Sequence, residues 1–326
     1  MKRRDFLALL SAATTNIFAT NASAKTPSEM FRTGTNDFSP PAQVVRFIAF
    51  GDAGTGDRAQ HDLARVMAAH HQSRPFDTAL MLGDNIYPDG HLSDIPAKFE
   101  RPYAELLRCG VTFQAVLGNH DVRKGREGQI NYPNFNMGGR AYYSFTRGGG
   151  LVEFFALDSN EFDRQQRWWL EQALTASRAR WKIAFFHHPI YSSGDKHGSN
   201  LRLRVALEPL LVRHGVAAAF SGHDHIYERT RPQQGVQYFI SGAGGKLRRG
   251  DLNRNTPFFA SGSDEASSFM SVAITPQRFS FNTIDVKGRV IDSGELEPRA
   301  TASNAAPSAR PIRRPIPLNP RRNQYE

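Results

Sequence analysis

The sequence predicts an α/β sandwich with mixed sheets, and two patterns indicate it. Over roughly the first two thirds of the chain, short β-branched and aromatic runs alternate with helical patterns; after residue 235 the pattern is rich in strands. Strand–helix alternation is typical of parallel sheets, and consecutive strands add antiparallel pairing. Hydrophobic residues make up 40% of the 326 residues, which is enough for a substantial core.

The strands are expected where β-branched and aromatic residues run together. These runs cover residues 44–50, 78–82, 112–117, 151–157, 182–186, 216–220, 236–240, 269–274 and 279–284. Apolar runs of about 4–8 residues bounded by turn residues are typical of buried strands. No apolar run reaches the roughly 18 residues of a membrane-spanning helix, so no such helix is expected.

The helices between these strands are identified by spacing and by end signals. Residues 58–71 repeat apolar side chains on one helical face. Asp163 with Gln166 resembles a capping box at the start of a second helix. A leucine-rich stretch over residues 203–211 leads to Gly215, a plausible C-cap, and Pro209 indicates a kink or a late start of that helix.

The two ends of the chain differ from the body, which covers residues 44–297. Residues 1–24 place Arg3 and Arg4 before a short, weakly apolar stretch and end in Ala-Ser-Ala, a pattern typical of a twin-arginine signal peptide. We therefore expect the twin-arginine machinery to export the protein to the periplasm or beyond. Residues 25–43 are irregular, and the Pro- and Arg-rich residues 298–326 are expected to be disordered.

The net charge of +10 comes mostly from the two ends. Residues 1–24 carry a net +2 and residues 298–326 a net +5, which leaves +3 for the body. A mildly basic body favours a small anionic substrate, and no stable nucleic-acid or membrane partner is expected. Cys109 is the only cysteine, so no intrachain disulfide can form.

Five short motifs of Asp, Asn and His directly follow five of the expected strands. They are Gly51-Asp52-Ala53-Gly54, Gly83-Asp84-Asn85-Ile86-Tyr87, Gly118-Asn119-His120-Asp121, His187-His188-Pro189 and Gly222-His223-Asp224-His225. Open α/β sheets build their sites outside the carboxyl ends of strands, so all five motifs could converge. His223 and His225 are expected to face one side, as alternate residues of a strand end do. Each motif alone could be a turn, but the set indicates a metal site, because carboxylates, imidazoles and amide oxygens suit hard or borderline ions.

The ordered motifs resemble those of the calcineurin-like metallophosphoesterase superfamily. Tyr87, three residues after Asp84, and His197-Gly198 after the fourth motif are similar to purple acid phosphatases, above all to the small tartrate-resistant type. The likeness spans about residues 44–245. It implies a four-layer α/β/β/α sandwich with two mixed sheets and a dinuclear metal site at the carboxyl ends of the strands. Ala53 stands where the animal enzymes commonly have tryptophan, which leaves the fine substrate preference open.

The resemblance also implies seven metal ligands. One ion would take Asp52, Tyr87 and His225, the other would take Asn119, His187 and His223, and Asp84 would bridge them. A phenolate favours Fe(III) at the first position, and the second would hold Fe(II), Zn(II) or Mn(II). His187 is preferred to His188 because the family pattern places one residue between this histidine and the proline.

The implied activity is acid-phosphatase-like hydrolysis of phosphoric monoesters by metal-bound hydroxide. His120 and His197 lie outside the ligand set and are expected to stabilise the phosphoryl oxygens and protonate the leaving oxygen, a role worth about 10²–10⁴-fold. Asp121 is expected to orient His120. For His197, an exposed loop histidine is the alternative. Asp158, the segment Tyr227-Glu228-Arg229 and the basic residues Lys246, Arg248 and Arg249 could lie near the site or be structural.

Two other functions stay open. A phosphodiesterase or nucleotide pyrophosphatase could use the same metal core. The Arg- and Pro-rich tail motivates a second class, a non-catalytic metal-dependent binding protein, because such tails can bind anionic surfaces. Serine hydrolase chemistry is disfavoured, because no G-x-S-x-G motif occurs.

Overall fold

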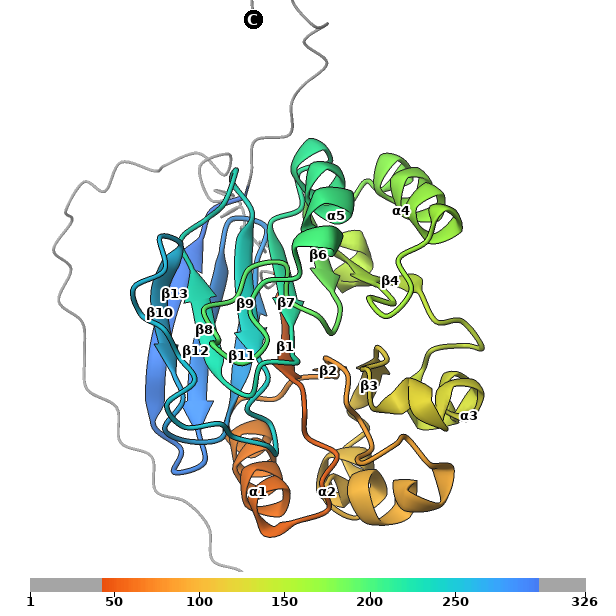
Figure 1. Ribbon diagram of the computed structural model, residues 1–326, viewed down its shortest axis with the longest axis vertical. Helices are drawn as coiled ribbons and strands as arrows, with labels where there is room; N and C mark the ends of the chain where they lie inside the picture. Colours follow the sequence, from red (N-terminus) through yellow and green to blue (C-terminus); the bar gives the residue numbers. More distant parts are fainter. Residues whose placement is uncertain (1–42, 299–326) are drawn as a thin grey trace, which may run out of the picture. The chain divides into compact units, whose positions relative to one another are not determined.

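The computed structural model describes residues 43–298, which form two mixed β-sheets stacked face to face with helices on their outer sides (Figure 1). This arrangement confirms the predicted four-layer α/β/β/α sandwich with two mixed sheets. The predicted signal peptide at residues 1–24, nearly all of the irregular segment at 25–43 and nearly all of the tail at 298–326 lie outside the described residues.

The first sheet has six strands in the order β13-β12-β11-β1-β2-β3. Their bounds are β1 Val45–Phe50, β2 Thr78–Met81, β3 Thr112–Ala115, β11 Ser268–Ile274, β12 Phe279–Asp285 and β13 Val290–Leu296. β1, β2 and β3 run parallel, whereas β11, β12 and β13 pair antiparallel with their neighbours. Three of the five motifs therefore leave the same edge of this sheet.

The second sheet has seven strands in the order β10-β8-β9-β7-β6-β5-β4. Their bounds are β4 Tyr143–Arg147, β5 Val152–Ala156, β6 Trp181–Phe185, β7 Ala218–Ser221, β8 Tyr227–Thr230, β9 Gln237–Ser241 and β10 Phe259–Ser263. The central strands β5, β6, β7 and β9 are parallel, and β4, β8 and β10 add antiparallel edges. The fourth and fifth motifs follow β6 and β7.

The α-helices are α1 Arg58–Ser73, α2 Ala104–Arg108, α3 Arg126–Asn131, α4 Arg164–Ala176 and α5 Leu201–Arg213. The short helical segments are η2 Leu92–Asp94, η3 Pro96–Glu100, η4 Asp121–Arg123, η5 Pro133–Phe135 and η6 Gly148–Gly150. Asp57, Asp163 and Asn200 cap the three long helices by accepting a backbone N–H in the first turn. Pro209 lies inside α5, which begins eight residues earlier at Leu201, so the predicted late start was wrong.

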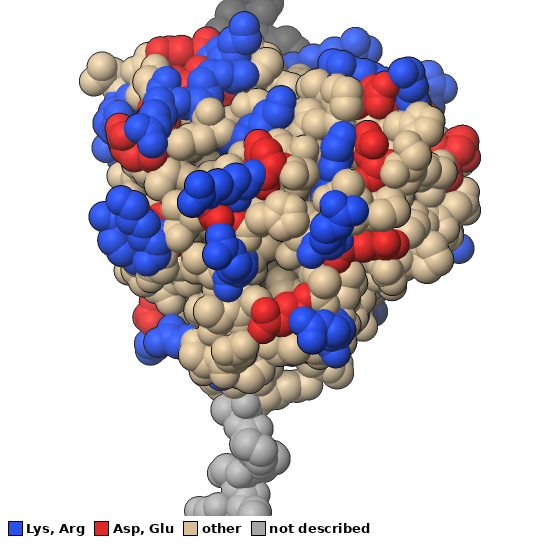
Figure 2. Space-filling model, turned by 90° about the horizontal axis from the view of Figure 1, so that it is seen from below, with Lys and Arg blue, Asp and Glu red and all other residues tan. Residues whose placement is uncertain are grey.

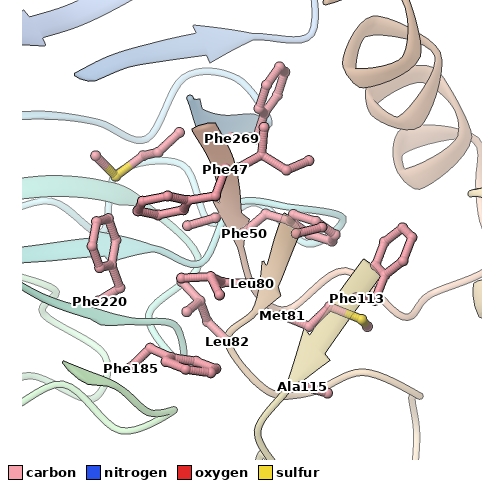
Figure 3. Packing of buried hydrophobic residues seen from close by; sticks show 14 of the residues in the cluster. Phe47, Phe50, Leu80, Met81, Leu82, Phe113, Ala115, Phe185, Phe220 and Phe269 are labelled. Carbon is pink, nitrogen blue, oxygen red and sulfur yellow. The ribbon is translucent and has the colours of Figure 1, made fainter. Parts of the chain in front are cut away.

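The core follows the two-residue period of the strands. On β1, Phe47 faces the second sheet, where its ring centre lies 5.1 Å from Phe154 and 5.9 Å from Phe220 (Figure 3). Phe50 faces the other way and packs 5.4 Å from Tyr103 on the outer side of the first sheet. On the outer side of the second sheet, α4 and α5 bury their leucines against β5, β6, β7 and β9. Each sheet thus has one face in the central layer and one beneath helices.

Four strands were not foreseen by residue range: β4, β8, β10 and β13. Several of them carry a charged or exposed pattern that does not resemble a buried run. β13 exposes Val290, Ser293 and Glu295, and β8 contains Glu228 and Arg229. On the face in Figure 2, basic and acidic side chains lie interspersed, in keeping with the small net charge of the body. Within residues 43–298, the helices are all too short or too polar to be membrane-spanning segments.

Candidate metal centre

The five motifs meet where the strand ends of the two sheets adjoin. The first three leave β1, β2 and β3, and the last two leave β6 and β7. Asp52, Asp84 and His223 have φ angles of 56°, 52° and 71°, a left-handed backbone that non-glycine residues rarely adopt. Such strain persists only where the surroundings enforce it, and it clusters at functional sites.

Glycine precedes several of these residues because there is no space for a Cβ atom. A Cβ on Gly118 would lie 2.2 Å from Asp84 Oδ1, and one on Gly222 would lie 2.5 Å from Asp52 Oδ2. The lack of a side chain therefore allows the strand ends to approach the neighbouring carboxylates.

The side chains of Asp52, Tyr87 and His225 form a first cluster. The Tyr87 hydroxyl donates to Asp52 Oδ1 at 3.2 Å and lies 3.3 Å from His225 Nε2. His225 Nε2 is itself 3.6 Å from Asp52 Oδ1. The other carboxylate oxygen of Asp52 accepts the backbone N–H of His223 at 2.8 Å, which fixes the orientation of the carboxylate.

The side chains of Asn119, His187 and His223 form a second cluster. His187 Nε2 lies 3.1 Å from Asn119 Oδ1 and 3.2 Å from His223 Nδ1. His187 Nδ1 donates to the Leu82 carbonyl at 2.9 Å, so Nε2 of the neutral ring carries the lone pair that faces the cluster.

Asp84 lies between the two clusters. Its Oδ1 is 3.5 Å from His187 Nε2, and its charge reaches both Asp52 and Tyr87. One donor atom from each of Asp52, Asp84 and His187 lies within 4.8 Å of the others, a separation that suits a bound cation. The structure thus brings all seven predicted ligands together in the predicted two groups, although their roles as ligands stay a prediction.

The electrostatic environment of these seven side chains favours the binding of cations. Burial, with the nearby charge of Asp84, raises the pKa of Asp52 well above its usual range. Burial and the neighbouring His187 lower the pKa of His223 to about 2, and burial lowers the pKa of His225 to about 4. Buried carboxylates and neutral imidazoles whose lone pairs converge are unfavourable alone, and two positive ions would relieve both effects.

His120 lies against the first cluster and His197 against the second. The His120 ring packs 4.5 Å from the Tyr87 ring, its Nδ1 donates to the Pro88 carbonyl at 2.6 Å, and its Nε2 lies 3.9 Å from Asp84 Oδ2. The His197 ring centre lies 4.3 Å from that of His223. A cavity of about 530 Å³ is lined by His188, Lys196, His197 and His223 among other residues. His120 and His197 thus both lie beside the donor clusters, and their catalytic roles stay predictions.

The predicted role of Asp121 was wrong. Its buried carboxylate accepts N–H groups from Gly118 at 2.8 Å and from Asn85 and Ile86 at 3.0 Å each, so it braces the second and third motifs. The Pro88 carbonyl, rather than Asp121, binds His120 Nδ1. Adjacency in sequence suggested the pairing, but the side chain of Asp121 points into the fold.

The fifth motif also differs from its expected geometry. His223 and His225 lie in a loop after β7 rather than on a strand, because His223 has a left-handed backbone. His188 was not predicted to neighbour the second cluster. One of its ring nitrogens nevertheless lies within 4.8 Å of ring nitrogens of His187 and His223. The Nδ1 atom of His188 forms a hydrogen bond with Ser159 Oγ at 2.9 Å. In the sequence, the position of Ser159 after a strand end was the one feature that could have indicated this contact.

The remaining candidates are mainly structural. Asp158 is buried and pairs with Arg126 at 2.6 Å. Tyr227 and Arg229 both bind Asp292. Lys246 and Arg248 are the exceptions. The Nζ of Lys246 lies 4.0 Å from the centre of the Tyr87 ring, and the backbone N–H of Arg248 donates to the His225 carbonyl at 3.0 Å.

Two adjoining donor clusters at strand ends can hold metal ions, and comparison with known proteins shows that the chain is a metal-dependent phosphoesterase. The model of the family described as calcineurin-like phosphoesterase matches residues 45–227, more than half of the chain. The protein therefore belongs to this family, which confirms the expected metal-dependent phosphoesterase.

Similar proteins indicate which branch of this family the chain resembles. Purple acid phosphatase 17 of Arabidopsis thaliana is 30% identical over 280 residues, which cover 76% of this chain and 82% of that protein. Tartrate-resistant acid phosphatase type 5 of Sus scrofa is 27% identical over 315 residues, which cover 83% of this chain and 92% of that protein. These relatives confirm the predicted resemblance to purple acid phosphatases of the tartrate-resistant type.

A solved structure shares the fold. GAP50, described as the anchor in the inner membrane complex of Plasmodium, superimposes with a TM-score of 0.70 over 79% of this chain and 90% of that chain, at 21% identity.

Proposed function

We propose that the protein hydrolyses phosphoric monoesters at a dinuclear metal centre. One observation carries this proposal: two donor clusters, Asp52–Tyr87–His225 and Asn119–His187–His223, adjoin through Asp84. The similarity to purple acid phosphatases supports a monoester as substrate.

The seven side chains would hold two ions, with the first cluster binding Fe(III) through Tyr87. The second cluster offers an amide oxygen and two imidazoles, which suit Fe(II), Zn(II) or Mn(II). When bound, two such ions neutralise the charge of the phosphoryl group and supply an activated water.

His120 and His197 would act on the substrate rather than on the metals. With His120 Nδ1 donating to the Pro88 carbonyl, only Nε2 is left to donate to a phosphoryl oxygen. His197 lines the cavity beside the second cluster, where a leaving oxygen could receive its proton. His120 would stabilise charge on the phosphoryl group and His197 would donate a proton to the leaving oxygen. The two histidines would therefore lower the activation barrier of hydrolysis in different ways.

The test is a rate comparison with metal analysis. Purified protein of known iron, zinc and manganese content would be assayed on an aryl phosphate monoester and on the corresponding bis-ester. Faster hydrolysis of the monoester, with two metals per chain and a visible absorption band, is expected. Preference for the bis-ester would support the phosphodiesterase or pyrophosphatase alternative, and bound metals without any hydrolysis would support a binding protein. An active, iron-free and colourless enzyme would overturn only the Fe(III)–Tyr87 assignment.

We also propose export by the twin-arginine route to the periplasm or beyond, on the strength of Arg3, Arg4 and the Ala-Ser-Ala sequence ending at residue 24. Replacing both arginines with lysine should retain the full-length protein in the cytoplasm, as measured by fractionation and immunoblotting. Unchanged export of the double variant would refute this route.

A further inference from the structure

Lys246 is held directly beside the first donor cluster. Its backbone N–H donates to the Asp52 carbonyl at 3.0 Å, and Gly244, two residues earlier, donates to the Gly51 carbonyl at 3.0 Å. These two bonds fix the loop after β9 against the first motif. The side chain then extends over the Tyr87 ring, with Nζ 4.0 Å from the ring centre.

Within residues 43–298, no carboxylate forms an ion pair with Lys246, and its ammonium group contacts the face of the Tyr87 ring. The Tyr87 ring itself is restrained by its hydroxyl contacts to Asp52 and His225 and by the edge-on His120 ring. The cation and the aromatic ring are therefore both held in place.

A cation over an aromatic face is attracted by the electron density of the ring, and the attraction grows when the ring is an anion. If Tyr87 binds Fe(III) as a phenolate, the ammonium group of Lys246 would stabilise the electrons of the ring over which it lies. Transfer of an electron from phenolate to iron then needs more energy. A nearby positive charge also favours the reduced form of the iron.

We propose that Lys246 adjusts the electronic properties of the phenolate–iron pair. The stacked ammonium group raises the energy of the phenolate-to-iron charge-transfer band and raises the Fe(III)/Fe(II) potential of the iron bound by Tyr87. This inference rests on the proposed function and on Tyr87 as an iron ligand. It makes Lys246 a positioning residue that acts through Tyr87.

The experiment compares visible spectra and reduction potentials at equal iron content for the wild type and for Lys246→Met, Lys246→Gln and Lys246→Arg. Both neutral variants should shift the band to longer wavelength, on the order of 10 nm, and lower the potential. Lys246→Arg should retain a band and potential near those of the wild type, because it keeps the charge. Lys196→Met is the matched control: it removes a lysine that lines the cavity beside the second cluster but does not lie over Tyr87.

An unchanged band and potential in both neutral variants would overturn the inference. An equal shift in Lys196→Met would also overturn it, because the effect would then come from net charge and not from the stacked ammonium. If iron-loaded wild type has no charge-transfer band, the Tyr87 assignment fails and the role of Lys246 fails with it. Monoester hydrolysis by that same sample would still support the proposed function, so the two failures can be told apart.

Discussion

The backbone N–H of His223 donates to Asp52 Oδ2 at 2.8 Å, which joins residues 171 positions apart. The bond ties the fifth motif, at the end of the second sheet, to the first motif, at the end of the first sheet. It also turns the other carboxylate oxygen of Asp52 toward Tyr87. Asp52 therefore has two separable roles, one structural through Oδ2 and one in the first donor cluster through Oδ1.

Replacing Asp52 with asparagine should separate these roles. The amide oxygen can still accept the His223 N–H, but the charge that would bind an ion is lost. We expect metal content to fall sharply, as measured by elemental analysis. The metal-free variant should unfold at a temperature no lower than metal-free wild type, because a buried carboxylate repelled by Asp84 has been removed.

Asp52→Ala is the matched comparison, because it leaves the His223 N–H without an acceptor and should cost about 1–3 kcal/mol of stability. Full metal content in Asp52→Asn would contradict the assignment of Asp52 as a ligand.

Gly118→Ala tests the close approach between the second and third motifs. The new Cβ would lie 2.2 Å from both the backbone N and Oδ1 of Asp84, so the carboxylate must move out of its position between the clusters. We expect loss of metal and of monoester hydrolysis. Gly110→Ala is the control: its Cβ meets nothing within 4 Å, and its φ of 79° should cost about 1–2 kcal/mol of stability without moving Asp84. Retained metal in Gly118→Ala would show that the Asp84 loop can shift without consequence.

His120→Ala should lower kcat for monoester hydrolysis by about 10²–10⁴-fold while the metal content stays at the wild-type level. The reason is that the bond from His120 to Asp84 Oδ1 uses the backbone N–H, which alanine retains, whereas the ring packs on Tyr87 with its Nδ1 fixed by the Pro88 carbonyl. His61→Ala on α1, outside the five motifs, should leave kcat unchanged. Wild-type turnover of an aryl phosphate by His120→Ala would refute its catalytic role.

The sequence was informative where strand ends carry residues with distinctive chemistry. Five motifs in order predicted the site, and the grouping of Tyr87 with His225 agrees with their separation of 3.3 Å. The motifs did not reveal the direction in which a side chain points. Asp121 follows His120 in the chain, but its carboxylate accepts one backbone N–H from its own turn and two from the turn after β2, an arrangement that depends on how β2 and β3 align.

Long-range partners were equally hidden from the sequence. Lys246 contacts Tyr87 across more than half of the described chain, and no local pattern links a residue after β9 to a residue after β2. The edge strands were missed for a different reason: a strand such as β13, none of whose residues is buried, lacks the hydrophobic run by which buried strands are identified.

Glu228 should make the stability of the metal-free protein depend on pH. It is fully buried and accepts the N–H and hydroxyl of Ser193, and burial raises its pKa from an ordinary 4.5 to about 7. A raised pKa means that the folded state binds the proton more tightly than the unfolded state. This stabilisation is complete below pH 4.5 and is lost as the pH rises toward 7.

Across that window the free energy of unfolding should fall by on the order of 3 kcal/mol through Glu228 alone. Glu228→Gln should reduce this fall, as measured by urea unfolding at several pH values, whereas the exposed Glu265→Gln should not. An identical pH dependence in wild type and Glu228→Gln would contradict the raised pKa.

Asp251 should control His197 through the loop that carries it. Its Oδ1 accepts the Lys196 N–H at 2.9 Å, and its carbonyl accepts the Asp195 N–H at 2.8 Å, so the two residues before His197 are both fixed. Asp251→Ala removes the first bond and should displace the imidazole from the leaving oxygen. An alkyl leaving group needs that proton far more than an activated aryl group does. We therefore expect kcat to fall at least about 10-fold more for an alkyl phosphate than for a nitrophenyl phosphate, within the range of general acid catalysis.

The neighbouring Asp195→Ala serves as the control, because its exposed carboxylate accepts a hydrogen bond from the Asn253 amide at 3.3 Å rather than from the Lys196 N–H. It should affect both substrates little and equally. Equal losses on the two substrates in Asp251→Ala would indicate that the loop supports the fold generally and that His197 does not protonate the leaving group. A loss confined to the alkyl phosphate would instead connect the 2.9 Å bond at Lys196 to proton transfer by the next residue in the chain.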